Sequence, residues 1–100
     1  MSDTVYTISQ LKEKLIPVFV DNRIRRAVLF GSYGKGSATE ESDIDLLVDS
    51  DLKGLRFVGL IEAIRAAVDK DVDIFDITHV QKGSKIDLEI QKTGVLMYEK

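Results

Sequence analysis

Two stretches of the chain repeat apolar residues at three- and four-residue steps, the spacing of one face of a helix. The first predicts a helix that Thr7 or Ser9 caps and that ends near Asn22. Pro17 lies inside it, and because proline lacks an amide donor we expect a kink or a split there. The second predicts a helix over 55–70. The apolar positions are Ile8, Leu11, Leu15, Val18 and Phe19 in the first stretch and Leu55, Val58, Ile61, Ile64 and Val68 in the second.

Three short apolar runs, bounded by charged residues or glycine, predict strands. They cover residues 25–30, 42–49 and 71–77. A short helix with Ser84 as N-cap and Gly94 as its stop follows, and the last six residues form either a brief strand or a docked tail. The order helix, strand, strand, helix, strand, helix predicts an α/β (α+β) fold, in which helices cover one or both faces of a sheet.

Length and composition indicate a single domain, since 100 residues can close one core but not two. Apolar residues make up 44% and charged residues 31%, which is typical of a compact soluble protein. No apolar run is long enough to cross a bilayer, and the first residues lack the features of a signal peptide. The chain contains no cysteine, which excludes disulfides and thiolate metal sites. We therefore expect a cytoplasmic protein with no membrane partner.

The charge is unevenly distributed. The net charge of −3 argues against direct binding of nucleic acid. Between Ser37 and Leu52 there is no lysine or arginine, so this acidic stretch repels itself unless it is solvated or holds a cation. Its acids are Glu40, Glu41, Asp43, Asp45, Asp49 and Asp51, of which Asp43 and Asp45 are the candidate ligands and the others are expected to be solvated.

Asp43 and Asp45 flank an isoleucine in the second predicted strand, so their side chains point the same way. Two neighbouring carboxylates can grip one hard cation; without it they repel, and one tends to take up a proton. Asp73 has the same apolar–acid–apolar setting and completes a three-carboxylate cluster if the strands are neighbours. Asp71 lies on the same predicted face, so a register error would move the assignment. Ligands of oxygen alone favour Mg²⁺ or Mn²⁺ over zinc.

The loop before these acids is rich in glycine. Gly31 and Ser32 close the first strand, and Gly34 and Gly36 let the backbone approach a ligand. If a helical turn begins at Ser32, its amides and the hydroxyl suit a phosphate, to which Lys35 adds a positive charge. A phosphate cradle beside a magnesium site is typical of a phosphoryl or nucleotidyl transferase.

Each of these motifs is weak alone. A Gly-Ser pair occurs in many turns, and Asp-x-Asp also marks solvated strand edges and calcium loops. Their joint spacing, with the acid pair starting seven residues after Gly36 and flanked by apolar strands, favours function over structure. His79, the only histidine, follows a strand end and is interpreted as a loop residue.

The stretch "GSYGKGSATEESDIDLLVD", followed by "VDI", resembles the minimal nucleotidyltransferases, single-domain members of the polymerase-β-like superfamily. The resemblance covers nearly the whole chain and implies a small mixed sheet flanked by helices. Tyr33 stands where the family often carries arginine. The resemblance assigns the triphosphate to Gly31 and Ser32, with Lys35 and Gly36 beside it, the metals to Asp43 and Asp45, and metal binding and activation of the acceptor hydroxyl to Asp73.

The family resemblance implies transfer of an NMP from a nucleoside triphosphate, with ATP the expected donor, to a hydroxyl. It implies two Mg²⁺ ions, with Mn²⁺ as the alternative. Because such proteins are commonly encoded with a HEPN-type toxin, it implies an antitoxin that adds AMP to a tyrosine of that partner.

Two other functions stay open. A chain of this size, with a shallow one-sided site, is compatible with a homo- or hetero-oligomer and with a non-catalytic antitoxin that masks its partner. A free-standing aminoglycoside- or tRNA-modifying enzyme is less favoured by the size and the acidic charge.

Overall fold

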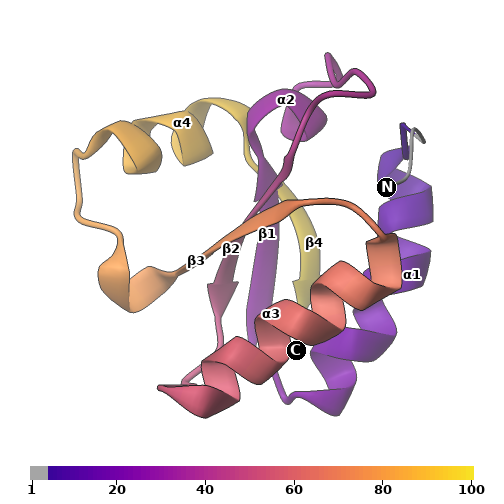
Figure 1. The fold of residues 1–100 in the computed structure, drawn as a ribbon. Coiled ribbons are helices and arrows are strands. Elements are labelled where there is room, and N and C mark those ends of the chain that lie inside the picture. The colour runs from indigo at the N-terminus through magenta and orange to yellow at the C-terminus, as the bar shows by residue number, and fades with distance from the viewer. Residues whose placement is uncertain (1–4) are drawn as a thin grey trace.

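A computed structural model of the chain describes residues 5–100 as one four-stranded sheet with helices packed around it (Figure 1). The strand order is β3-β2-β1-β4; β2 and β3 are parallel, and the other pairs are antiparallel. The elements are α1 Ile8–Asp21, β1 Arg26–Phe30, α2 Gly31–Gly34, β2 Ile44–Asp49, α3 Leu55–Val68, β3 Val72–Asp76, the 3-10 helix η1 Ile77–His79, α4 Lys85–Thr93 and β4 Val95–Glu99. The predicted α/β class with a small mixed sheet is confirmed.

The helix ends follow the local sequence. Thr7 caps α1 in a reciprocal arrangement with Gln10, and the Ser84 hydroxyl accepts the Asp87 amide at the start of α4. Gly94 ends α4, as predicted. The expectation of a split at Pro17 is wrong, since α1 runs through it as one helix. The ring lies on the exposed side, and the buried Leu15 and Phe19 on either side hold the helix against the core.

The remaining differences lie at element ends. Each predicted strand is shorter in the structure, so Asp43 precedes β2 instead of lying within it. The last residues form a strand, β4, which pairs with β1. The four-residue helix α2 contains the helical turn that was considered at Ser32, whereas the single turn η1 was not predicted, because a helix this short has no periodic pattern to reveal it.

One face of the sheet forms the core. Ile44, Leu46 and Val48 alternate along β2 and are fully buried. Helices α1 and α3 pack against each other and cover this face, as Figure 1 shows. The helices contribute Leu11, Leu15, Phe19, Leu60, Ile64 and Val68, all of which are fully buried. This continuous apolar contact holds the strands in register.

The opposite face is covered only in part. The rings of Phe30 and Phe75 lie 5.8 Å apart there, and α4 packs against β1 nearby. Asp45 and Asp73 lie on this second face, because they alternate with the buried residues of β2 and β3. Among residues 5–100, no helix is both long and apolar enough to cross a membrane.

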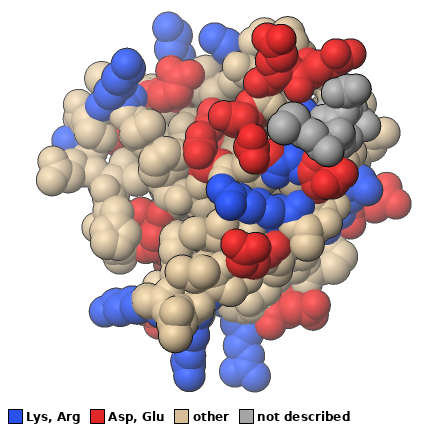
Figure 2. All heavy atoms as spheres, in the orientation of Figure 1, with Lys and Arg blue, Asp and Glu red and all other residues tan. Residues whose placement is uncertain are grey.

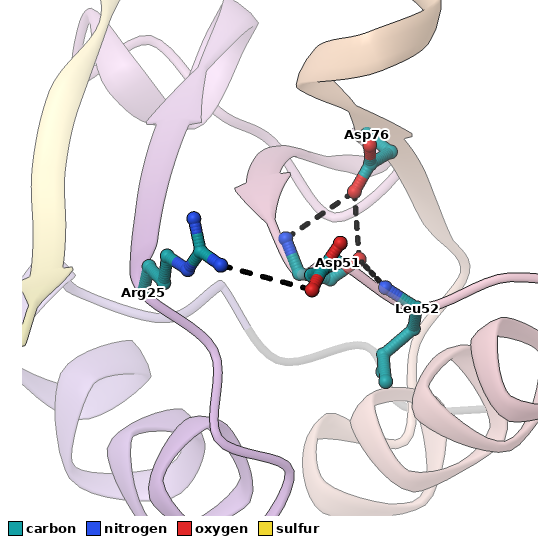
Figure 3. Close-up of polar contacts among 5 residues, drawn as sticks. Arg25, Asp51, Leu52 and Asp76 are labelled. Carbon is teal, nitrogen blue, oxygen red and sulfur yellow. Dashed lines mark hydrogen bonds and ion pairs between the residues drawn. The ribbon is translucent and has the colours of Figure 1, made fainter.

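At the C-terminal ends of β2 and β3, a buried carboxylate ties the two strands together (Figure 3). Asp76 accepts hydrogen bonds from the Ser50 amide (3.3 Å) and hydroxyl (2.6 Å) and from the Thr78 amide (3.1 Å) and hydroxyl (2.6 Å). The Ser50 hydroxyl in turn accepts the amide of Leu52 (3.1 Å). Burial opposes ionisation of Asp76, but the bonds from Ser50 and Thr78 outweigh it and lower its pKa below 3.8.

We predict that Asp76→Asn lowers the free energy of unfolding by about 1–3 kcal/mol at pH 7, because an amide cannot accept all four bonds. The pKa of Asp76 is lower in the folded state, so its stabilisation is present above the unfolded value and disappears as the pH falls through the folded one. Urea unfolding from pH 7 to 3 should show the two proteins converging.

The matched control is Asp51→Asn, since Asp51 is exposed and its contact with Arg25 is 3.7 Å long. This control should lie within about 0.5 kcal/mol of wild type. A difference between wild type and Asp76→Asn that stays constant down to pH 3 would contradict the role of the ionised carboxylate.

Candidate active site

Strand register brings two of the three predicted acids together. In the parallel pairing of β2 with β3, Asp45 stands directly beside Asp73. Asp43 comes just before β2, exposed, and the adjoining Ile44 amide donates to the Asp71 carbonyl at 3.1 Å. The register therefore pairs Asp73, not Asp71, with Asp45. Figure 2 shows acidic side chains gathered above the start of β2 and over the loop that precedes it.

The environment of Asp45 disfavours its ionised form. Its pKa is raised from 3.8 to about 6, first by partial burial and then by the charges of Asp73, Asp43 and Glu89. Glu89 lies on α4 and was not predicted as part of the site. No spacing in the sequence links it to the Asp-x-Asp motif; only the packing of α4 brings its charge near Asp45.

Gly31 lies against Asp45. A Cβ atom at position 31 would collide with the Asp45 Oδ2 atom, and Gly31 has a φ of +71°, which side chains rarely allow. Its amide donates to the Thr93 hydroxyl at 2.8 Å. Gly31 therefore holds the turn close against Asp45, and its amide is not free for a ligand because it already has a partner.

In the rest of the glycine-rich segment, some residues are accessible to a ligand and one, Gly34, packs against α4. Ser32 is half-buried in α2, and Lys35 and Gly36 are exposed just after it. Gly34 packs against the Thr93 carbonyl, where a Cβ would collide, so its lack of a side chain serves packing against α4 and not the approach of a ligand. This corrects the expectation for Gly34.

Tyr33 points into the protein. It is 3% exposed and belongs to the apolar core, and its hydroxyl has no hydrogen-bond partner among residues 5–100. Where the family often carries arginine, this chain thus has a core residue that puts no charge near the glycines.

Lys70 holds the loop that leads to Asp43. It is 8% exposed, and its ammonium group donates to the Glu40 carbonyl at 3.2 Å. Within the loop, the Thr39 amide donates to the Ser42 hydroxyl (2.9 Å) and the Ser42 amide to the Thr39 carbonyl (3.0 Å). The acidic loop is therefore anchored at its base by a cation from the end of α3.

The acids are neighbours but not a closed ligand set. Within the part of the chain that the structure describes, no three acidic or histidine side chains are grouped closely enough to hold a metal ion. Like charges with no cation between them repel, which favours separated, solvated side chains. Their donor chemistry fits Mg²⁺ or Mn²⁺: carboxylate oxygens stand at paired positions of two strands, exposed at Asp73 and partly exposed at Asp45.

A cavity of about 520 Å³ lies elsewhere, at the other end of β3. Phe57, Asp76 and His79 are among its lining residues, and none of the predicted site residues is. His79, in η1, is exposed and lines this separate cavity, so it is interpreted as a surface residue outside the acid site.

Gly31 of the Gly-Ser turn lies against Asp45, which pairs with Asp73 on the neighbouring strand, an arrangement that agrees with the resemblance to nucleotidyltransferases. The family comparison agrees: residues 13–100 match the model of the family "Polymerase beta, Nucleotidyltransferase". The chain belongs to this family. Members of this family generally use divalent metal ions.

Curated relatives from Methanocaldococcus jannaschii are similar to much of this chain. One, named "Putative protein adenylyltransferase MJ0435", is 35% identical over 69 residues, which is 67% of this chain and 74% of the relative. A second, MJ1379, carries the same name and is 34% identical over 76 residues, which is 68% of this chain and 76% of the relative.

Solved structures share the fold. A toxin–antitoxin structure with AMP-PNP aligns with a TM-score of 0.75 and 26% identity, over 89% of this chain and 73% of that one. A tri-AMPylated Shewanella oneidensis HEPN toxin in complex with an MNT antitoxin aligns with a TM-score of 0.70 and 22% identity, over 94% of this chain and 74% of that one.

We predict that Asp45→Asn stabilises the metal-free protein by about 1 kcal/mol at pH 7.5, allowing for solvent screening of this partly exposed group. The folded-state pKa of Asp45 is raised, so its ionised form costs stability above about pH 6, and that cost disappears near pH 4. Urea unfolding in EDTA at both pH values measures the difference.

Asp49→Asn is the matched control, because Asp49 lies on the same face of β2. It should show no such gain. If Asp45→Asn proves less stable than wild type at pH 7.5 without metal, the carboxylate is a structural group and the electrostatic strain assigned to it is absent.

Proposed function

We propose that the chain transfers AMP from ATP to a tyrosine hydroxyl of a HEPN-type toxin and so acts as its antitoxin. The observation that carries the proposal is the pairing of Asp45 with Asp73 in register, with Gly31 of the Gly-Ser segment packed against Asp45. The relatives named as protein adenylyltransferases support the choice of AMP. The likeness to a toxin–antitoxin structure with AMP-PNP supports the choice of role.

In this proposal the metal ligands are Asp43, Asp45 and Asp73. Two Mg²⁺ ions, or Mn²⁺ in their place, would neutralise the phosphates and lower the pKa of the attacking hydroxyl. Asp45 suits this role because its pKa is raised by burial and then by the neighbouring charges of Asp73, Asp43 and Glu89, charges that a bound cation would offset. Nucleotide binding is assigned to Gly31, Ser32, Lys35 and Gly36.

The Gly-Ser segment orients the triphosphate. Gly31 packs against Asp45 and so places the segment beside the carboxylates, the Ser32 hydroxyl can donate to a phosphate oxygen, and the exposed Lys35 can add a positive charge. Because Tyr33 is buried in the core, it takes no part in contacting the phosphates.

The reaction is a displacement at the α-phosphorus of ATP. The tyrosine oxygen forms a bond to that phosphorus, and the bond from the phosphorus to the oxygen bridging to the β-phosphate breaks. Pyrophosphate leaves, and the hydroxyl proton passes to a carboxylate oxygen of Asp73. The product is tyrosine carrying AMP through a phosphodiester bond, and the protein returns to its starting state when Asp73 releases the proton to water.

The proposal treats residues 1–100 as a single minimal nucleotidyltransferase domain whose acceptor surface comes from the partner. The acidic site suits a basic acceptor surface, since opposite charges draw the two proteins together. The proposal also includes a cytoplasmic location, because the reaction needs a supply of nucleoside triphosphate as its donor.

We predict that Asp43→Ala and Asp45→Ala each reduce transfer of label from α-labelled ATP to the toxin by at least about a hundredfold. The loss follows from removing a ligand for the ions that neutralise the phosphates. Asp49→Ala, on the same face of β2, should transfer label at close to the wild-type rate. The assay measures labelled toxin over time at several Mg²⁺ and Mn²⁺ concentrations.

The double variant Asp43→Asn with Asp45→Asn separates catalysis from masking. Under the proposal it still binds the toxin but no longer silences it. If it binds and silences as well as wild type does, the chain acts by covering its partner. Absence of label transfer by wild type at any metal concentration contradicts the proposed activity.

A further inference from the structure

The Thr93 hydroxyl joins α4 to the Gly-Ser segment. It accepts the amide of Gly31 at 2.8 Å and donates to the Glu89 carbonyl, one turn back in α4, at 2.8 Å. Gly31 and Thr93 are 62 residues apart in the chain. The two bonds use the one proton of the hydroxyl and one of its lone pairs, so each group has a defined partner.

The contact is buried and tight. Thr93 is 7% exposed and is the one buried residue of α4. Its carbonyl lies against Gly34, at the other end of α2, so a single residue of α4 touches both ends of that helix. Because a buried amide without a partner is costly, the Thr93 hydroxyl constrains where the Gly31 peptide can lie.

Gly31 transmits this constraint to the acids, because it has no room to move toward Asp45. We propose that Thr93 is a positioning residue for nucleotidyl transfer, which fixes Gly31 against Asp45 so that the triphosphate and the carboxylates meet in register. The inference rests on the proposed function and adds α4 to the active site.

The same packing explains why Glu89 acts on Asp45. Glu89 and Thr93 are four residues apart in α4, and residues at this spacing lie on one face of a helix. The face that holds Gly31 is therefore also the face that brings the Glu89 charge near Asp45, where it contributes to the raised pKa of that carboxyl.

The test compares Thr93→Val, which keeps the shape and loses both bonds, with Thr93→Ser, which keeps the hydroxyl. We expect Thr93→Val to lower kcat/KM for label transfer about tenfold or more and Thr93→Ser to restore it to within about threefold of wild type. Thr78→Val is the matched control: it removes a hydroxyl bonded to Asp76, at the far end of β3, and should lower stability without lowering kcat/KM.

Hydrogen exchange at the Gly31 amide gives a readout that does not need activity. The amide should be protected in wild type, Thr93→Ser and Thr78→Val, and should exchange at least about tenfold faster in Thr93→Val. If wild type transfers label and Thr93→Val matches it, the positioning role is overturned while the proposed function stands. If wild type transfers no label, the proposed function fails, and unchanged protection in Thr93→Val overturns the Gly31 contact on its own.

Discussion

The parallel pairing of β2 with β3 places two carboxylates, Asp45 and Asp73, side by side, and the rest of the site depends on that register. Ionised neighbours of this kind repel, so the pairing must be held by something else. The buried alternate residues of β2 and the helices α1 and α3 provide it from the opposite face of the sheet. The core fixes the register, and the register imposes the charge cluster.

The two ends of this strand pair use aspartate in opposite ways. Asp76 is ionised, buried and surrounded by four donors, and its pKa is lowered. Asp45 is partly buried beside other acids, and its pKa is raised. A carboxylate whose oxygens accept several hydrogen bonds stabilises the fold, whereas one placed beside other negative charges is suited to binding a cation. The same residue type therefore marks a structural contact at one end and a candidate active site at the other.

Local sequence signals predicted most of the fold. Helix periodicity, the caps at Thr7 and Ser84 and the alternation in β2 all depend on residues close in the chain, and the structure confirms them. Pro17 misled because packing on both sides of it outweighs one lost hydrogen bond. For the site, the spacing of the acids and glycines in the sequence identified them as candidate residues. Their assignment as ligands stays a prediction.

The residues that the sequence did not indicate act over long distances. Thr93 is hydrogen-bonded to Gly31, 62 positions away in the sequence, and Lys70 to Glu40, 30 positions away. The charge of Glu89 affects Asp45 because α4 packs near it. A threonine at a helix end or a lysine after a helix is ordinary in sequence, and only the folded chain gives it a partner.

The most direct test of the account is a titration of the isotopically labelled protein with Mn²⁺ and a non-hydrolysable ATP analogue, followed by amide NMR. Paramagnetic broadening should appear at the lowest Mn²⁺ concentrations at Gly31, Ser32, Asp45 and Asp73 and be weaker at Ser50 and Asp76, toward the other end of the same strands. Broadening centred on the far end, or none at these acids, would contradict the claim that β2 and β3 build a metal–nucleotide site.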